Sequence, residues 1–286
     1  MDERAQIFEP HRSRLHGIAY RMLSSRADAD DVVQDAYLRW HRAVADEVRS
    51  PEAWLVTTVT RLCIDRLRAA RTEREAYVGP WLPEPIVEQA EPADSATELA
   101  SSLSVAFLAV LERLAPEERA AFLLHDVFDS DYDEIARILG KSETACRQIV
   151  SRARKRDRAD QPRVHVPETA RRSLLNRFVT ALQSQDKSAL LQVLSDDVTW
   201  TSDGGGKAKA ARKVVQGADH VSRFVMGVIG RFANTCEMRP VTVNGQAGIA
   251  MYGYGRLISI ITVNTDGARI LGFYSVLNPD KLRGLS

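Results

Sequence analysis

The sequence predicts a multidomain protein in which two all-α domains, the second with a helix-turn-helix, precede an α+β domain. Apolar residues recur with helical spacing from Ala5 to about Arg74 and again between Phe107 and Arg158. A proline-rich segment separates these two blocks. After residue 168, two stretches with helical spacing are followed by four strand-like runs, which is typical of an α+β domain.

Composition and charge limit the class of protein. A chain of 286 residues has room for about two or three domains, and 44% hydrophobic residues is ordinary for a globular protein. The net charge of +1 gives no global sign of a nucleic-acid binder, but acids gather at Asp28–Asp35 and bases at Arg147–Arg158. A neutral total can therefore hide two surfaces with different partners.

The cysteines and the apolar runs indicate a cytoplasmic protein. Each cysteine stands without a CxxC partner, which favours small buried side chains in a reducing compartment over a metal or redox site: Cys63, Cys146 and Cys236. No apolar stretch approaches the roughly 18 residues of a membrane helix, so we expect neither a signal peptide nor a membrane span.

Residues 1–75 form the first predicted domain. Val33, Ala36 and Trp40 share one helical face, and Ser50-Pro51-Glu52 is a good start for a later helix because proline fits the first turn. Acids gather near the start of the earlier helix, where the helix dipole favours them. The later helix carries arginines on a similar side, at Arg61, Arg68 and Arg71. Taken alone, each feature also fits a solvated helix face.

Residues 76–103 form a predicted linker. The segment Tyr77–Pro85 holds three prolines and one glycine in nine residues, so we expect it to be extended. It also carries Trp81 and Leu82, which are unusual in an idle linker because large apolar side chains often anchor protein contacts. A passive tether is the alternative.

A helix-turn-helix is predicted within residues 104–160, the second all-α domain. Asp131–Glu134 resembles a capping box for a short helix, Gly140 ends that helix, and Ser142 can cap the next one. The second helix keeps a polar, cationic outer side, which reading the major groove requires. We expect DNA contacts at Ser142, Thr144, Arg147, Gln148, Ser151, Arg152, Arg154 and Lys155. For this segment alone, a two-helix corner with a solvated basic face is the alternative.

Residues 168–286 form the predicted α+β domain. Helices are expected around Leu174–Leu182 and Val221–Ile229. Asn244-Gly and Asp266-Gly are strong hairpin signals between strands. The strand-like runs are Arg239–Val243, Ala247–Tyr252, Leu257–Val263 and Ile270–Val276.

In their order, the motifs of the two all-α domains closely resemble the extracytoplasmic-function branch of the sigma-70 family. Asp28–Trp40 resembles the family's polymerase-clamp helix, and Ala53–Arg68 resembles its −10 element helix. The helix that starts at Pro116 and the helix-turn-helix, with its ending Arg152-Ala-Arg-Lys-Arg156, resemble its −35-reading domain. The resemblance covers residues 5 to about 158.

This resemblance implies two partners, core RNA polymerase and promoter DNA. Polymerase contacts are expected at Asp28, Asp31, Gln34 and Asp35. Contacts to the −10 element are expected at Trp54, Arg61, Asp65 and Arg68. Arg61 stands where the family usually has asparagine, and Thr60 where it usually has arginine.

The rest of the chain resembles a sub-group of these sigma factors that carries a C-terminal SnoaL-like domain, with the cone fold of nuclear transport factor 2. The resemblance rests on Tyr77–Pro85, Asp203-Gly-Gly-Gly-Lys207 and Asn278–Leu282. It implies that this domain regulates the sigma factor in place of a separate anti-sigma protein. Glycines let another backbone approach closely, so we expect the domain to hold the linker. The expected docking residues are Tyr77, Pro80, Trp81, Leu82, Pro83, Asp203, Gly204, Gly205, Gly206 and Lys207.

An enzymatic C-terminal domain is the alternative to a regulatory one. The available acid–base groups are Asp196, Asp197, Asp203 and His220, but paired aspartates before a strand are typical of a turn and His220 fits a surface position. The triple glycine allows a phosphate cradle, yet it lacks the GxxxxGK[ST] spacing. We therefore expect no catalytic residue, no cofactor and no metal site.

The sequence thus predicts a sigma factor that directs promoter-specific transcription initiation and is regulated by its own C-terminal domain. A small-molecule ligand of the cone is left open as a further partner. Two alternatives are a one-component helix-turn-helix regulator with a ligand-sensing cone and a cone-domain enzyme tethered to DNA. The regulator leaves the acidic helix at Asp28–Asp35 and the helix of Arg61 without a role.

Overall fold

The computed structural model describes residues 3–43, 48, 50–88, 104–160, 166–232 and 236–285, without the side chains of 156–160 and 229–232. These residues fall into two compact units. The first unit takes residues 3–75 and 107–160. The second takes residues 76–88, 104–106 and 166–285, so the start of the linker belongs with the C-terminal domain. The remainder of the linker, residues 89–103, lies outside the described residues.

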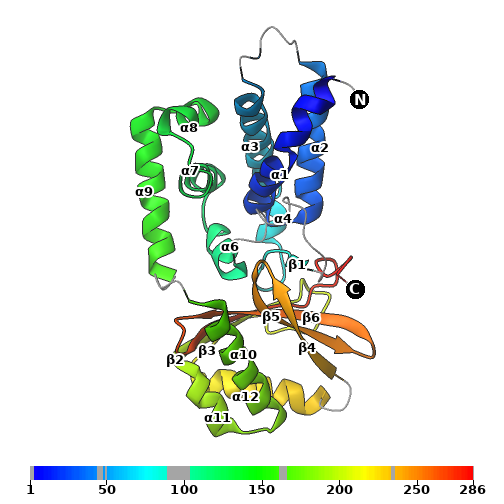
Figure 1. Ribbon diagram of the computed structural model, residues 1–286. Coiled ribbons are helices and arrows are strands. Elements are labelled where there is room, and N and C mark those ends of the chain that lie inside the picture. Colours follow the sequence, from blue (N-terminus) through cyan, green and yellow to red (C-terminus); the bar gives the residue numbers. More distant parts are fainter. Residues whose placement is uncertain are drawn as a thin grey trace. The chain divides into compact units, whose positions relative to one another are not determined.

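The first unit is all-α (Figure 1). Its N-terminal helices are α1 (Glu3–Leu23), α2 (Arg26–Arg42), α3 (Pro51–Ala69) and α4 (Arg71–Glu75). It continues with most of α6 (Val105–Leu111), then α7 (Pro116–Asp126), α8 (Tyr132–Leu139) and α9 (Glu143–Asp160). Helix α1 packs on α2 and α3, and α7 contacts α1 and α3, so the two predicted all-α domains lie in one unit.

Helix ends in this unit mostly follow the local sequence signals. The Ser50 side chain accepts the backbone N–H of Ala53 at 3.3 Å and caps α3. Gly140 ends α8 in the left-handed conformation, with φ of 64°. Ser142 accepts the backbone N–H of Ala145 at 3.2 Å. The capping box expected at Asp131 is wrong, because that side chain makes no cap hydrogen bond.

The second unit is built on a sheet with the strand order β1-β4-β5-β6-β7-β2-β3. Its strands are β1 (Val87–Glu88), β2 (Leu194–Asp203), β3 (Val215–Gln216), β4 (Cys236–Val243), β5 (Gln246–Gly253), β6 (Arg256–Thr265) and β7 (Ile270–Val276). Its helices are α10 (Glu168–Gln183), α11 (Lys187–Val193) and α12 (Ala218–Phe232). Neighbouring strands are antiparallel apart from the β2–β7 pair, which is parallel. Helix α10 packs on β5, and α12 packs on β2.

The meander predicted from the sequence corresponds to β4–β7. Asn244 and Gly245 turn between β4 and β5 with φ of 50° and 72°, and two positive φ values are what a type I′ hairpin turn needs. Strand β2 was not predicted. It includes Asp196 and Asp197, which were interpreted as a turn, and its pairing with β7 shifts register before Thr199.

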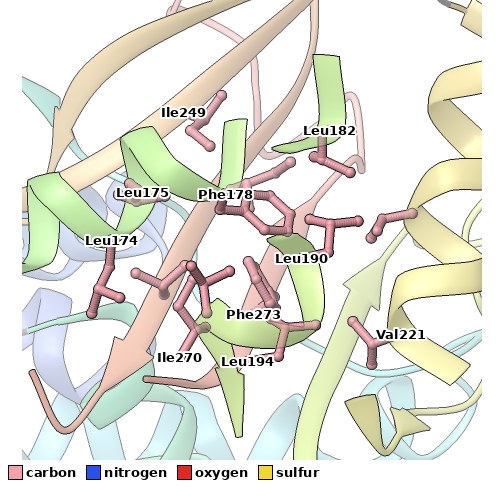
Figure 2. Packing of buried hydrophobic residues seen from close by; sticks show 14 of the residues in the cluster. Leu174, Leu175, Phe178, Leu182, Leu190, Leu194, Val221, Ile249, Ile270 and Phe273 are labelled. Carbon is pink, nitrogen blue, oxygen red and sulfur yellow. The ribbon is translucent and has the colours of Figure 1, made fainter. Parts of the chain in front are cut away.

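Aliphatic side chains and a few aromatic rings fill the layer between this sheet and its helices (Figure 2). Phe178 of α10 and Trp200 of β2 both lie 4.7 Å, centroid to centroid, from Phe273 of β7. Phe178 and Phe273 are buried. Full burial of such a side chain contributes about 1.5–3 kcal/mol, so this cluster fixes the helices on the sheet.

Two of the three cysteines are buried as expected, whereas Cys236 is partly exposed. All three are free, and Cys63 and Cys146 are buried. Burial raises the pKa of the Cys63 thiol, which keeps it protonated. Within the described residues no helix is long and apolar enough to cross a bilayer, and no three His, Cys, Asp or Glu side chains gather as a metal site.

Candidate DNA-reading surfaces and linker-binding site

Helix α9 presents most of the residues predicted to contact DNA. Its apolar residues Cys146 and Val150 are buried, and the helix packs on α7 and α8. Arg147 donates to Glu143 at 2.9 Å, one helical turn away, and its guanidinium lies 5.0 Å from the centroid of the Tyr132 ring. The predicted DNA contacts that are exposed on this helix and its cap are Ser142, Thr144, Arg147, Gln148, Ser151, Arg152 and Lys155.

Arg154 differs from the other predicted DNA contacts. It is half-buried, and it donates to both carboxylate oxygens of Asp126 at 2.6 and 2.7 Å. The hydrogen bonds to Asp126 raise the pKa of Arg154. A bidentate pair of this kind has a fixed geometry. In this structure Arg154 therefore ties α9 to α7.

The residues predicted to bind polymerase, three acids and one glutamine, divide into two pairs on α2. Arg66 of α3 bridges Asp28 at 2.5 Å and Asp31 at 3.0 Å. Gln34 and Asp35 are exposed. The first pair therefore also joins α2 to α3, a role that the sequence did not reveal.

The residues predicted to read the −10 element are partly engaged by the helix-turn-helix domain. Arg61 of α3 donates to the backbone carbonyls of Ile138 at 3.0 Å and Arg137 at 3.1 Å, in the last turn of α8. Carbonyls at a helix end lack helical partners, and the dipole there attracts a cation. Arg68 pairs with Glu117 of α7 at 2.6 Å.

The other two residues predicted to contact the −10 element are Asp65 and Trp54. The Asp65 side chain is 72% exposed and lies 3.6 Å from Arg68. The Trp54 ring lies 5.6 Å from that of Trp40, at a tilt. The structure therefore gives the four residues three different environments within the first unit.

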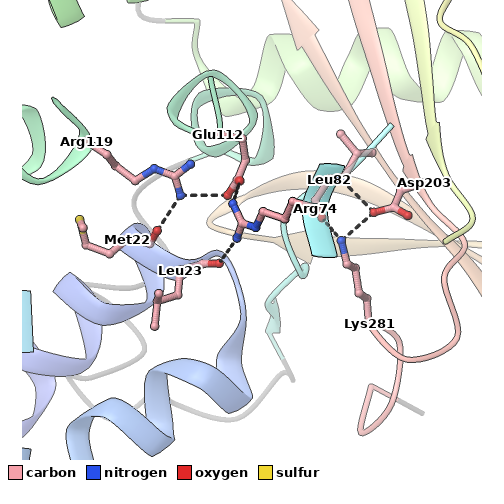
Figure 3. Close-up of polar contacts among 8 residues, drawn as sticks. All are labelled: Met22, Leu23, Arg74, Leu82, Glu112, Arg119, Asp203 and Lys281. Atoms are coloured by element: carbon pink, nitrogen blue, oxygen red, sulfur yellow. Dashed lines mark hydrogen bonds and ion pairs between the residues drawn. The ribbon is translucent and has the colours of Figure 1, made fainter. Parts of the chain in front are cut away.

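A buried ionic network joins α1, α4 and α7 (Figure 3). Arg119 of α7 donates to the Met22 carbonyl at 2.6 Å and to Glu112 at 3.0 Å. Arg74 of α4 pairs with Glu112 and donates to the Leu23 carbonyl at 3.2 Å. Burial would raise the pKa of Glu112, but the guanidinium groups of Arg119 and Arg74 outweigh it and hold that pKa below its ordinary value.

In the second unit, an ion pair between Asp203 and Lys281 binds the linker backbone (Figure 3). The two charged atoms are 2.7 Å apart, and both side chains are buried. Asp203 accepts the backbone N–H of Leu82 at 2.8 Å, and Lys281 donates to the Leu82 carbonyl at 2.5 Å. One residue of the linker is thus held by both of its backbone polar groups.

Two linker aromatics surround this ion pair. The Tyr77 hydroxyl donates to Asp203 at 2.5 Å and accepts from the Asn278 amide at 2.8 Å. Burial and the Asp203 carboxylate raise the pKa of Tyr77. The Lys281 ammonium lies 3.2 Å from the centroid of the Trp81 ring, which is a cation–π contact. The rings of Tyr77 and Trp81 meet edge to face at 4.7 Å.

Further along, the linker adds a strand to the sheet. Ile86 donates its N–H to the Asn244 side chain at 3.0 Å and accepts the Asn244 N–H at 2.8 Å. Val87 and Glu88, which form β1, then pair antiparallel with β4. Leu82 and Ile86 are buried, so the segment is docked at both ends.

The glycines of residues 204–206 allow this close approach. A Cβ on Gly205 would lie 2.4 Å from the Asn278 amide and 2.8 Å from the Tyr77 hydroxyl. A Cβ on Gly206 would meet Val78 at 3.3 Å, and both glycines have positive φ. Lys207, which was expected to contact the linker, pairs with Asp280 instead. Pro80 is half-buried and Pro83 is buried.

Sequence reasoning overlooked part of this site. Lys281 and Asn278 belong to a motif that was noted, but neither was assigned to docking. Asn244 was interpreted only as a turn residue. A lysine in an otherwise unexplained motif was the available signal, whereas nothing local to Asn244 indicates a partner such as Ile86, which lies 158 positions away.

Comparison with protein families defines the class of protein. The family model for sigma-70 region 2 matches residues 7–73, and the model for sigma-70 region 4 matches residues 104–156. These matches span α1–α4 and α6–α9, the two all-α domains. The fold and these regions are those of a sigma-70-type factor.

Individual relatives and a solved structure then show to which branch of the sigma-70 family the chain belongs. The chain is 38% identical over 294 residues to the ECF RNA polymerase sigma factor SigJ of Mycobacterium tuberculosis, covering 97% of this chain and 92% of the relative. It is 29% identical over 286 residues to the probable ECF RNA polymerase sigma factor SigI of the same organism, with 98% and 95% covered. The crystal structure of M. tuberculosis SigJ matches with a TM-score of 0.80 at 34% identity and covers 98% of both chains. The chain belongs to the extracytoplasmic-function (ECF) RNA polymerase sigma factors.

Proposed function

We propose that this sigma factor binds core polymerase through α2, reads the −35 element through α9 and the −10 element through α3, and is controlled by its C-terminal domain through the linker. One observation carries the proposal. The buried pair of Asp203 and Lys281 binds both backbone groups of Leu82, within the segment that connects the two DNA-reading domains along the chain.

The contacts inside the first unit imply a closed state of these domains. The names of the promoter elements place them about 25 base pairs apart, which is roughly 85 Å of B-form DNA at 3.4 Å per base pair. Arg61 lies only 3.0 Å from the Ile138 carbonyl. The same chain cannot keep this contact and read both elements on one duplex. Promoter binding therefore requires α3 and α8 to separate.

The docked linker offers a way to control that separation. Opening lengthens the span that the linker must cover between the two domains. A linker held at Tyr77, Leu82 and Ile86 has fewer free residues to span it. The strength of docking would then set how readily the domains open. In a passive tether, by contrast, loss of docking would leave promoter output unchanged.

We also propose that the chain catalyses no reaction and works in the cytoplasm, where its polymerase is. Three side chains considered for acid–base chemistry have structural or solvent-facing environments. Asp203 is paired with Lys281, the Asp196 side chain is fully exposed, and His220 is exposed and contacts the Gln216 carbonyl. The C-terminal domain has a hydrophobic core that includes Phe178, Trp200 and Phe273. The ligand left open above forms no part of the proposal.

The direct test is reconstitution with core polymerase. Full-length protein and core enzyme should co-elute, and the complex should select a two-part sequence from random DNA and start transcripts at a fixed distance from it. The protein without polymerase should start none. If the protein selects DNA as a dimer and adding it to core polymerase produces no new transcript starts, the protein is a one-component regulator instead.

A further inference from the structure

A basic loop in the C-terminal domain, residues 207–213, has no part in the contacts described so far apart from Lys207. Its sequence is Lys-Ala-Lys-Ala-Ala-Arg-Lys, which puts four cations in seven residues. Asp or Glu is absent from the whole stretch between Asp203 and Asp219. The loop is therefore locally strongly positive in a chain whose net charge is only +1.

Most of this charge lacks compensation. Lys207 pairs with Asp280, whereas Lys209, Arg212 and Lys213 are exposed and form no ion pair with any residue that the structure describes. Several other cations of the domain do have partners. These pairs are Lys187 and Arg223 with Asp219, Arg239 with Glu237, and Arg269 with Asp196.

The start of the loop, together with the residues before it (204–210), forms a tight turn. The backbone N–H groups of Lys207 and Ala208 both donate to the Gly204 carbonyl at 3.0 Å. A Cβ on Gly204 would lie 2.6 Å from the Ala208 carbonyl and 2.8 Å from the Ala210 side chain, so the turn is tight. The small alanines between the cations leave room for a bulky polyanion to approach.

The loop lies beside the linker. A Cβ placed on Gly79 would be 3.8 Å from the Cα atom of Arg212, and Gly206 approaches Val78 in the same way. The linker joins the −10 and −35 readers along the chain, so the loop is tethered to the segment that connects the two readers.

We propose that Lys209, Arg212 and Lys213 bind the phosphate backbone of promoter DNA in the spacer between the −35 and −10 elements, without regard to its sequence. The inference rests on the proposed function. DNA fits better than an acidic protein surface, because residues 207–213 hold no apolar side chain larger than alanine. Protein contacts usually rely on large anchors, whereas phosphates require only positive charge.

A charge-matched pair of full-length variants tests this in the holoenzyme. The loop variant is Lys209→Gln, Arg212→Gln and Lys213→Gln. The control is Arg172→Gln, Arg177→Gln and Arg256→Gln, three exposed arginines on α10 and β6 that also form no ion pair with a described residue. Both variants lose three positive charges, so a general effect of net charge would appear equally in both.

The readout is the affinity of each holoenzyme for promoter DNA across a salt series. Each phosphate contact adds about 0.9 to the magnitude of the negative slope of log affinity against log salt. Loss of three contacts should therefore reduce that magnitude by about 2.7 in the loop variant and leave it unchanged in the control. Uncharged methylphosphonate linkages in the spacer should weaken binding of the wild-type holoenzyme and leave the loop variant unaffected. Equal slopes for the two variants would overturn the proposal.

Two further outcomes separate the possible failures. A loop variant that loses core polymerase while keeping its DNA salt slope would assign the loop to the polymerase and overturn DNA binding. Absence of transcript starts with wild-type protein would instead reject the sigma-factor proposal. If wild-type protein starts transcripts normally and the loop variant keeps the wild-type salt slope, only the inference about the loop fails.

Discussion

Replacing Asp203 with alanine should release the linker from the C-terminal domain. The Asp203 side chain is fully buried and is bound to Lys281, to the Leu82 N–H and to the Tyr77 hydroxyl. Removing one partner of a buried ion pair costs about 3–5 kcal/mol, because the other charge is left without compensation. When the linker undocks, Lys281 returns to water and this cost disappears. The substitution therefore destabilises the docked state relative to the undocked one.

Hydrogen exchange at two linker amides measures that loss. The Leu82 amide bonds to the carboxylate that is removed, whereas the Ile86 amide bonds to Asn244, which the substitution leaves intact. Each 1.4 kcal/mol is a factor of ten, so a loss of 3 kcal/mol should speed exchange by roughly 100-fold. If the segment undocks as one piece, both amides should accelerate together.

Asp196→Ala is the matched control. Asp196 lies on the same strand, β2, but its side chain is fully exposed, so both amides should keep their wild-type exchange. Unchanged protection of Leu82 in Asp203→Ala would refute the reasoning. Acceleration at Leu82 alone would show that the ion pair acts locally and does not hold the linker.

Three other predictions concern the first unit. Arg147→Ala should weaken binding to the preferred −35 site by about 1–3 kcal/mol and relax the base preference at one or two positions, because arginine contacts base edges with two hydrogen bonds. A binding-site selection that returns the wild-type preference would count against this placement of Arg147. Asp35→Lys should abolish co-elution with core polymerase and change unfolding by less than about 0.5 kcal/mol, since Asp35 is exposed. Asp31→Lys should also destabilise the fold through Arg66, and retained co-elution would remove both acids from the interface. The lowered pKa of Glu112 means that its stabilisation is present above its ordinary pKa of 4.5 and is lost as pH falls through the folded value. Urea unfolding should therefore show a weaker acid dependence for Glu112→Gln than for wild type, and equal dependence would show that another group is responsible.

Local signals were enough to predict the helix-turn-helix. Gly140 and Ser142 mark a helix end and a helix start through their own backbone chemistry, and the structure shows both. The hairpin at Asn244 was predictable for the same reason. Strand β2 was missed because it pairs in parallel with β7, far away in sequence, and because Asp196 and Asp197 are typical of turns.

Contacts that depend on tertiary structure could not be predicted. The sequence places Arg61 on an exposed helix face, but nothing near it shows that carbonyls 76 and 77 positions away occupy its donors. Likewise, Arg154 belongs to a basic run that favours phosphate contacts, yet it pairs with Asp126 across two helices. Linker docking was partly predictable, because a large aromatic side chain such as Trp81 is unusual in an idle linker and the glycines of residues 204–206 let another backbone approach closely.

Run-off transcription with three holoenzymes tests the central claim, that a docked linker controls a sigma factor. The proteins are wild type, Asp203→Ala and Asp196→Ala, each bound to the same core polymerase on the same selected promoter. The account predicts equal transcript from wild type and Asp196→Ala, and output from Asp203→Ala that differs by about tenfold or more, as a loss of at least 1.4 kcal/mol in docking implies. Equal output from all three, with the Asp203→Ala linker shown to be undocked by hydrogen exchange, would contradict it.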